Sequence, residues 1–464
     1  MVHLPEDFVC ETRRIMGDER FERYLKAFEE EPPVSIRLNP RKSLVPAPSP
    51  NKEKSVGMSP IAEGWGGEPV PWCSDGYYLA RRPNFTMDPL FHAGCYYVQE
   101  ASSMFLWHVV NEELRIKNEE FAAAKVGSPE RDSSFFILHS SFNCLDLCAA
   151  PGGKSTLLRS VLPEGSTLIS NEPIRNRYQV LAENVQKWGY PDHVVTNLYP
   201  RDFVKGKQRF DLILCDVPCS GEGMFRKDAA TIGEWSLRNV EKCQQLQREI
   251  VSDAWKCLND GGLLIYSTCT LNTKENEENV RWIVDELGAE VLPVATKPEW
   301  NITGSLLEGF TEPVYRFIPG IARGEGLFLC VLRKGGVWKV ECGVRNVECG
   351  MRNEECGRRN ENRLSACSLS SSSDGKNISH STFHTPHSTL YINLSYSQAI
   401  AYLRGEALVL PEDTPRGLVT VAFMGHPLGQ VKNIGSRANN LYPKAWRIKT
   451  THIPQDYEAI LRHS

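Results

Sequence analysis

Residues 142 to 334 alternate short apolar runs with longer stretches of helical periodicity, and this alternation limits the possible folds more than any other feature of the chain. The apolar runs lie at residues 144–147, 167–170, 193–196, 211–215, 263–267 and 327–332. Helical patterns at residues 174–188, 241–258 and 274–287 separate several of them. Such alternation predicts an α/β domain with a parallel sheet wrapped by helices. Because ligands of such sheets bind at the carboxyl ends of the strands, chemistry is expected there.

The first expected strand runs into residues 148–156, CAAPGGKST. The end of this loop looks like a nucleotide-binding P-loop, which needs a glycine, four residues and then Gly-Lys-Ser/Thr. Gly153, Lys154 and Ser155 supply that end, but Cys148 stands where the first glycine is required. A nucleoside triphosphate site is therefore disfavoured. The loop still joins a strand to a helix N-terminus, which makes a good cradle for another ligand.

The bulk composition is that of an ordinary globular protein, with 41% hydrophobic and 24% charged residues among 464. This length predicts two to four domains. There is no apolar run of about 18 residues to suggest a membrane span, and the charged N-terminus has no signal-peptide core. We therefore expect a cytoplasmic protein that does not bind a membrane, whose 15 cysteines are reduced thiols. The net charge of −4 leaves only a local patch for nucleic-acid binding.

The regions outside the alternating segment differ from it in composition. Residues 1–100 mix helical and strand patterns and predict an α+β domain, and residues 101–141 hold a connecting helix and a polar insertion. Residues 336–388 contain the repeat VECGVRN, VECGMRN, EECGRRN, which fits neither a coiled coil nor zinc spacing and predicts a disordered low-complexity linker. Residues 389–464 form a small domain in which basic and aromatic residues are interleaved, a pattern that suits RNA.

Three other strand ends carry reactive or polar groups. Glu172 follows the second strand about 20 residues beyond the glycine loop, the interval typical of an acid that binds ribose hydroxyls. The fourth strand runs into Asp216 and Cys219, and the fifth runs into Cys269. Two cysteines are thus expected at neighbouring strand ends, beside a nucleoside-type pocket. Other cysteines of the strands and helices (144, 215, 257 and 330) are expected to be small buried side chains.

Several motifs resemble those of Sun-type RNA cytosine-C5 methyltransferases, and most closely the bacterial RsmF-like branch. They are CAAPGGKST, NEP, DVPCSGEGMFRKD, STCTLN, PWCSDGYYL, DPLFHAGCYYVQEASSM, RGEGLFLCVLRK and HPLGQVKNIGSRANNLYPKAWR. The resemblance covers most of residues 1–335 and 390–464. It implies a Rossmann-like class I methyltransferase sheet at residues 142–335, an N-terminal α+β RNA-positioning domain and a C-terminal PUA-like RNA-binding domain.

The resemblance also implies that the cradle holds S-adenosylmethionine, not a phosphate. The residues implied to line the cofactor are Cys148, Ala149, Ala150, Pro151, Gly152, Gly153, Lys154, Glu172 and Asp216. Similar enzymes have an acid after the third strand, near the adenine. Here Tyr199 stands at the expected position, so either Asp202 or Asn197 is expected to make that contact.

The chemistry of such an enzyme requires a thiolate, because carbon 5 of cytosine is a poor nucleophile until a nucleophile adds at carbon 6. By resemblance, Cys269 is the nucleophile, Cys219 assists product release and Asp216 hydrogen-bonds the cytosine edge. Lys154 is expected to place positive charge near the thiols and to lower the pKa of the nucleophile. Glu222 and Lys227 have two open interpretations, as surface groups of a loop or as neighbours of the active site.

Small-subunit ribosomal RNA, or the 30S subunit, is the expected substrate by analogy, and the protein is expected to be a monomer without a metal. A transfer-RNA cytosine methyltransferase and a non-catalytic RNA-binding assembly factor remain alternatives. A DNA cytosine methyltransferase is disfavoured, because its nucleophile follows proline in a PCQ motif, whereas PCSGEG here is accompanied by a separate TCT strand end. Arg175, Arg177 and Lys187 are expected to form a solvated helix face.

Overall fold

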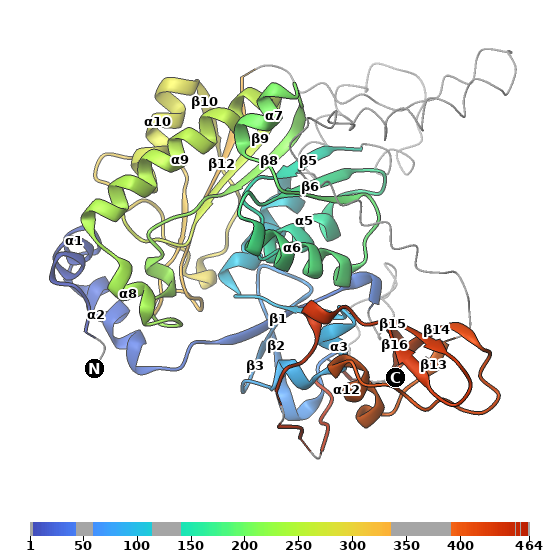
Figure 1. The fold of residues 1–464 in the computed structure, drawn as a ribbon. Helices are drawn as coiled ribbons and strands as arrows, with labels where there is room; N and C mark the ends of the chain where they lie inside the picture. The colour runs from blue at the N-terminus through green and yellow to red at the C-terminus, as the bar shows by residue number, and fades with distance from the viewer. Residues whose placement is uncertain are drawn as a thin grey trace, which may run out of the picture.

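The computed structural model describes residues 3–42, 59–113, 141–335, 391–450, 452–454 and 456–462, which form three sheets with their helices (Figure 1). The insertion expected before residue 141 and the repeat linker expected at residues 336–388 lie almost wholly outside this part of the chain. None of the helices in the described part is long and apolar enough to cross a membrane.

The central sheet contains eight strands in the order β10-β12-β9-β8-β5-β6-β7, with β11 paired to β12. Five of the strands are mutually parallel: β5 (Asn143–Asp146), β6 (Thr167–Asn171), β7 (His193–Thr196), β8 (Phe210–Asp216) and β9 (Leu258–Thr268). The helices that follow them are α5 (Gly153–Val161), α6 (Arg175–Trp188), α7 (Pro200–Lys205), α8 (Ala230–Glu234), α9 (Leu237–Cys257) and α10 (Glu277–Leu287). The expected α/β alternation is therefore confirmed.

The expected parallel sheet has one antiparallel edge. β12 (Leu327–Lys334) runs antiparallel to β9, to β10 (Ala289–Leu292) and to β11 (Tyr315–Phe317). A parallel neighbour needs a crossover that returns the chain to the same end of the sheet. Here α10 leads to β10 at the sheet edge, and the chain then comes back through β11, so β12 enters between β10 and β9 from the opposite end.

Alternate residues of the central strands supply two cores, one on each face of the sheet. Leu212 and Leu214 pack with Leu157 of α5 and with Phe105, which lies in a helix that covers residues 105–113. Ile213 packs on the other face, in the cluster that includes side chains of α7, α9 and α10. This period of two is that of a strand covered on both sides, as the apolar runs predicted.

The N-terminal domain begins with α1 (Glu6–Met16) and α2 (Asp18–Lys26), whose apolar faces pack near Phe225 and Trp235 of the central domain. Its sheet has the order β2-β3-β1-β4, formed by β1 (Val34–Leu38), β2 (Gly66–Pro69), β3 (Gly76–Leu79) and β4 (Tyr96–Val98), with α3 (Pro89–His92) beside it. The expected mixture of helices and strands in residues 1–100 is confirmed.

The C-terminal domain has a second four-stranded sheet, β13-β14-β15-β16, with one helix. Its elements are β13 (Tyr391–Asn393), α12 (Tyr396–Arg404), β14 (Gly417–Phe423), β15 (His426–Asn433) and β16 (Ala438–Asn440). It lies beside the N-terminal domain (Figure 1), and the two share one apolar cluster. Backbone bonds of Ala62 N to Ile460 O (2.9 Å) and of Arg462 N to Pro60 O (2.8 Å) join the last described residues to the N-terminal domain.

Candidate active site

Two thiols meet at the carboxyl ends of two neighbouring parallel strands. β8 and β9 pair in a register that sets Asp216 opposite Ser267, so the loops that follow carry Cys219 and Cys269 to the same place. The two Sγ atoms lie 3.3 Å apart, and both side chains are partly buried. The expected juxtaposition of the two sulfur atoms is therefore observed. Cys144, Cys215, Cys257 and Cys330 are buried, as expected.

The two thiols differ in acidity. The hydrogen bond from Cys219 is the main influence that lowers the pKa of Cys269, and Lys154 lowers it further against the opposing effects of burial and Asp216. The same hydrogen bond, together with burial, raises the pKa of Cys219 well above its ordinary value. Cys269 is therefore the thiol of the pair that ionises first, with Cys219 as its hydrogen-bond donor.

A partly buried ion pair lies beside the thiols. Lys154 Nζ in the first turn of α5 lies 2.9 Å from Asp216 Oδ2, and Ser267 Oγ donates to Asp216 Oδ1 at 2.7 Å. Burial alone would lower the pKa of Lys154, but Asp216 outweighs that effect and raises it. Lys154 thus carries its charge at neutral pH, and both carboxylate oxygens of Asp216 are held in place.

The buried carboxylate of Glu222 links the two cysteine loops by hydrogen bonds. Its carboxylate accepts hydrogen bonds from Trp235 Nε1 (2.8 Å), Leu271 N (2.7 Å) and Asn272 N (3.0 Å), and the side chain is 2% exposed. The interpretation of Glu222 as a surface group is therefore wrong, although Lys227 is exposed. A buried carboxylate that receives several N–H donors fixes the loops that supply them.

Glu275 is a second carboxylate that links the cysteine loops by hydrogen bonds, and it was not predicted from the sequence. It accepts hydrogen bonds from Ser220 N (3.1 Å), Gln247 Nε2 (2.7 Å) and Asn272 Nδ2 (2.9 Å). Burial raises the pKa of Glu275 to about 7, and Glu222 also raises it. The signal in the sequence was the density of acids and amides just after Cys269, in residues 272–279.

Two glycines let the loops approach each other closely. Gly223 N donates to Cys269 O at 2.7 Å, and a Cβ on Gly223 would lie 2.7 Å from that same oxygen. Gly326 has φ +122°, and a Cβ there would lie 2.9 Å from Cα of Gly223. Each glycine is therefore required for the backbone contact that positions Cys269.

The glycine loop after β5 is held by side chains that bind its carbonyl oxygens. Arg177 Nη2 donates to Ala150 O (3.0 Å), Asn184 Nδ2 to Pro151 O (2.8 Å) and Arg37 Nη2 to Gly153 O (3.2 Å). We call this set of three donors the carbonyl clamp. Arg177 is half exposed, as expected of a solvated helix face, and it also donates to the loop from α6. Arg175 is exposed, as expected, whereas Lys187 is partly buried and pairs with Glu183.

Arg37 brings the N-terminal domain to this loop. It is 1% exposed, it donates from Nε to Gln99 Oε1 (2.8 Å) and from Nη2 to Thr156 Oγ1 (2.7 Å), and its guanidinium lies 4.5 Å from the centre of the Trp188 ring. Burial lowers the pKa of Arg37 to about 10, so it remains charged at neutral pH. Nothing in the local sequence around β1 identified this residue.

The remaining members of the cradle lie where the strands end. Ala149 and Ala150 are buried, Cys148 is partly buried, and Pro151 is exposed after a cis Ala150–Pro151 peptide bond. Gly152 has φ +111°, a conformation that favours glycine, and it starts the turn into α5. Asn171 holds the ends of three strands together, because its side chain bonds Leu147 O (3.1 Å) and Leu198 O (2.9 Å).

Glu172 lies buried at the end of β6, where its carboxylate accepts from Ile174 N (2.9 Å) and lies 3.5 Å from Arg177. The two candidates for the acid after β7 are engaged locally. Asn197 Nδ2 donates to the backbone oxygens of Glu172 (2.6 Å) and Pro173 (2.9 Å). Asp202 accepts from Tyr199 N (3.1 Å) in the first turn of α7. In the described residues, no three His, Cys, Asp or Glu side chains gather as a metal site.

Three family models match this chain in order. They are the N-terminal domain of 16S rRNA methyltransferase RsmF at residues 4–101, 16S rRNA methyltransferase RsmB/F at residues 138–333 and the methyltransferase RsmF PUA domain at residues 389–448.

Curated relatives carry the name ribosomal RNA small subunit methyltransferase F. The relative from Klebsiella pneumoniae is 31% identical over 72% of this chain and 64% of its own length, so the chain aligns with just under two thirds of it. The relative from Citrobacter koseri is 28% identical over 96% of both chains.

Solved structures share the fold. One described as a methyltransferase homolog protein from Pyrococcus horikoshii has a TM-score of 0.54 at 24% identity, covering 72% of this chain and 96% of that one. NSun6 from the same organism, solved with SFG, has a TM-score of 0.53 at 20% identity, covering 72% of this chain and 99% of that one. With three models matching in the same order as the three sheets, the chain belongs to the RsmB/F methyltransferase family and has the N-terminal and PUA domains of its RsmF members.

Proposed function

We propose that this protein transfers a methyl group from S-adenosylmethionine to carbon 5 of a cytosine in small-subunit ribosomal RNA, through a covalent bond between Cys269 and carbon 6. The observation that carries this proposal is the 3.3 Å separation of the Cys219 and Cys269 sulfur atoms beside the Lys154–Asp216 ion pair. A single thiolate suffices to add to a base, whereas a second thiol at this distance suits a reaction in which the bond must also be released.

The residues of the cradle fit the cofactor. The carbonyl clamp binds three backbone oxygens of the loop. The small side chains of the loop are therefore left free to line a ligand. The residues that would hold the cofactor are Cys148, Ala149, Ala150, Pro151, Gly152, Gly153, Lys154, Glu172 and Asp216, with Asn197 and Asp202 at the edge of the site. When bound, S-adenosylmethionine supplies an electrophilic methyl group.

The chain's own groups account for the remaining steps. The Cys269 thiolate forms the S–C6 bond, and the electron pair of the C5–C6 double bond moves towards carbon 5, which becomes nucleophilic. Asp216 hydrogen-bonds the edge of the cytosine in this proposal, supported by the contacts of Lys154 and Ser267 that keep its carboxylate oriented. After methylation, carbon 5 loses its proton to a base, the S–C6 bond breaks, and Cys269 regains its electron pair. Cys219 assists this release by exchanging a proton next to the departing sulfur.

RNA is the substrate that the flanking domains fit. Carbons 5 and 6 of a stacked cytosine are blocked by its neighbours, so the base must be unstacked before it reaches the thiols. Binding through phosphates predicts an affinity that weakens steeply with salt. An affinity that is flat between low and moderate salt would argue against a phosphate-binding surface.

The proposal is tested by comparing bisulfite sequencing of ribosomal and transfer RNA from cells with and without the protein. We expect one 16S rRNA cytosine to lose its methyl group in cells that lack the protein. A lost site in transfer RNA instead would overturn the choice of substrate.

Substitution of the two thiols tests the mechanism. We expect Cys269→Ser to remove turnover by more than about 10³-fold and Cys219→Ser to accumulate a protein–RNA adduct that survives denaturation. Full turnover by Cys269→Ser would exclude it as the nucleophile. Absence of S-adenosylmethionine binding by the wild-type protein, measured by calorimetry, would favour a non-catalytic scaffold.

A further inference from the structure

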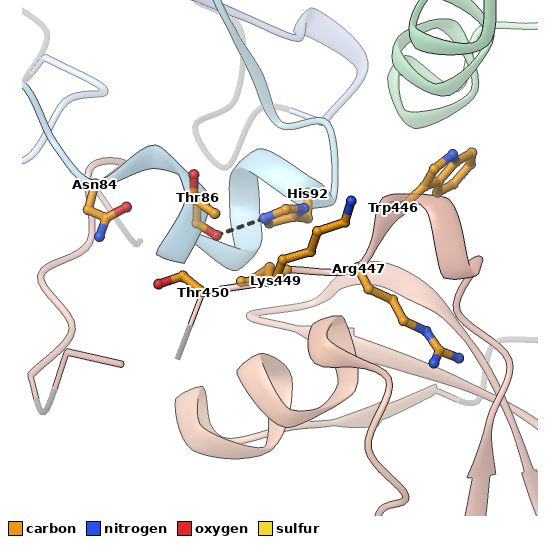
Figure 2. A pocket seen from close by; sticks show the side chains of 8 residues that line it. Asn84, Thr86, His92, Trp446, Arg447, Lys449 and Thr450 are labelled. Atoms are coloured by element: carbon orange, nitrogen blue, oxygen red, sulfur yellow. Dashed lines mark hydrogen bonds between the residues drawn. The ribbon is translucent and has the colours of Figure 1, made fainter. Parts of the chain in front are cut away.

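A cavity of about 530 Å³ lies between the N-terminal and C-terminal domains, away from the two thiols. One wall consists of Asn84, Thr86 and His92, and the other consists of residues 446–450 (Figure 2). This volume lies within the range of small-molecule sites, about 300 to 1,000 Å³. We call it the junction groove. None of its eight lining residues is acidic.

We propose that the junction groove binds one unpaired nucleotide of the substrate RNA, as an anchoring site remote from the base that is methylated. The proposal rests on the proposed function for its choice of RNA. It assigns the groove three kinds of contact with the nucleotide: a hydrogen-bond acceptor for a base or ribose donor, a cation for phosphate, and an aromatic surface for the base.

The acceptor is Nδ1 of His92. His92 Nε2 lies 2.9 Å from Thr86 O, and because a carbonyl oxygen can only accept, Nε2 carries the hydrogen of the neutral ring. Burial lowers the pKa of His92 to about 4, which keeps the ring neutral. Nδ1 is then a bare acceptor, and it is buried without a hydrogen-bond partner among the described residues.

An acceptor of this kind selects for a donor. His92 is 8% exposed and lines the groove, and because its Nδ1 is itself covered, a ligand supplies the missing hydrogen bond only when the covering atoms move aside. Exocyclic amino groups of bases and the 2′-hydroxyl of ribose are donors that RNA presents when a nucleotide is unstacked. Sulfate carries no such donor at neutral pH, whereas inorganic phosphate keeps at least one P–OH group.

The cation is chiefly Lys449. Its side chain is exposed and forms no ion pair with any residue of the described ranges. Figure 2 shows its ammonium group rising beside His92, whereas the guanidinium of Arg447 points away. Arg447 packs against Gly405 and donates to Tyr442 O at 3.4 Å, so it supports the wall more than the ligand. Lys187 stands at the edge, 5.5 Å from the Trp446 ring, with its charge paired to Glu183.

The aromatic surface is Trp446, whose indole is partly exposed above the groove. Tyr442 packs against the indole, at 6.0 Å between ring centres and an interplanar angle of 77°. An indole supported in this way offers a rigid surface on which an unstacked base can lie. The two walls are fixed relative to each other, because Tyr457 of the C-terminal segment donates to Asp88 in the N-terminal domain at 3.0 Å.

The test compares RNA binding by three variants of the full-length protein with a 16S rRNA fragment and with 30S subunits, in the absence of methyl donor. We expect Trp446→Ala to weaken binding by about tenfold, the loss that one stacked base gives, and Lys449→Gln to weaken it less. The control is Lys432→Gln on β15, which removes an exposed charge of the same domain outside the groove. Binding by Trp446→Ala and Lys449→Gln at the wild-type level would overturn the proposal, and so would an equal loss in Lys432→Gln.

A second measurement does not depend on the stability of variants. Irradiation of the wild-type complex with 4-thiouridine-substituted 16S rRNA is expected to cross-link peptides that contain residues 446–450, and cross-links confined to other regions would contradict the proposal. In turnover assays we expect Trp446→Ala to raise KM for RNA with kcat unchanged. Because binding is measured without methylation, a failure of the proposed cytosine chemistry would leave these binding results intact, and the two failures can be told apart.

Discussion

The thiol loops, which carry Cys219 and Cys269, and the cofactor cradle, residues 148–154, lie at the same edge of one sheet. The chain stabilises these two regions in opposite ways. The thiol loops are held from within the methyltransferase domain by two buried carboxylates, Glu222 and Glu275, which collect N–H donors. The cradle is held from behind by the three donors of the carbonyl clamp, and one of them, Arg37, comes from another domain. The comparison indicates that the thiol loops are held within one domain, whereas the glycine loop is held by two.

The largest effect on turnover is expected from substitution of Glu222, whose carboxylate links the thiol loops. Glu222→Gln replaces an acceptor oxygen with an amide N–H group that faces existing donors, so both cysteine loops should shift. We expect kcat to fall by about 100-fold while cofactor affinity stays within twofold, because a displacement of about 1 Å at reacting groups costs that much. The matched control, Glu234→Gln, changes an exposed glutamate of α8 and should behave as wild type. An equal loss of cofactor affinity in Glu222→Gln would remove the distinction between the two regions.

The next effect is expected from the clamp residue of the N-terminal domain. Arg37→Ala removes three hydrogen bonds and leaves Gly153 O and Thr156 without their buried donor. We expect the Kd for S-adenosylmethionine, measured by calorimetry, to rise about 30-fold with kcat at saturation nearly unchanged. Arg37→Lys keeps the positive charge, so it should bind S-adenosylmethionine more tightly than Arg37→Ala does. If Arg37→Ala lost affinity only because the protein unfolds, restoring the charge alone would not bring this recovery. A fall in kcat with unchanged affinity would place Arg37 with the reactive groups instead.

A smaller effect, visible in the pH profile, is expected from Lys154. In the proposed mechanism the Cys269 thiolate is the reactive form, so the rate should rise with pH through the pKa of Cys269 and then level off. Removing the positive charge in Lys154→Gln takes away one influence that lowers this pKa, so the inflection should move to higher pH. At a pH below both inflections, the rate falls about tenfold for every whole pH step by which the inflection rises. Lys154→Arg should keep the inflection near that of wild type, and an unchanged profile in Lys154→Gln would exclude this role.

The smallest effect is expected from Asn184, the neutral member of the carbonyl clamp. Asn184→Ala removes the hydrogen bond to Pro151 O and a longer one to Tyr97 Oη, but Tyr97 Oη still donates to Pro151 O at 3.3 Å. We expect cofactor affinity to fall about threefold, in line with the net value of one neutral hydrogen bond. If Asn184→Ala weakened cofactor binding as much as Arg37→Ala does, the charge of Arg37 would contribute nothing beyond a neutral hydrogen bond.

Much of the architecture was predictable because it depends on patterns between near neighbours in the chain. The apolar run at residues 193–196 identified β7 to the residue, and the apolar runs at 144–147 and 211–215 identified β5 and β8 to within a residue or so at each end. The positions of Cys219 and Cys269 followed from the same reasoning, since the carboxyl ends of adjacent parallel strands meet at one edge. The direction of β12 was not predictable, because its apolar run reads the same in either orientation.

The sequence by itself therefore determined the strands, the glycine loop and the pair of cysteines, because each of these leaves a local signature of period, spacing or residue type. Only the tertiary structure decided that Arg37 reaches Gly153 across 116 residues, that Glu222 is buried, and that the two outer domains share a core with a groove between them. The physical reason is that a contact between distant segments depends on how whole elements pack. The local sequence around one partner of such a contact does not indicate which distant residue the other partner is.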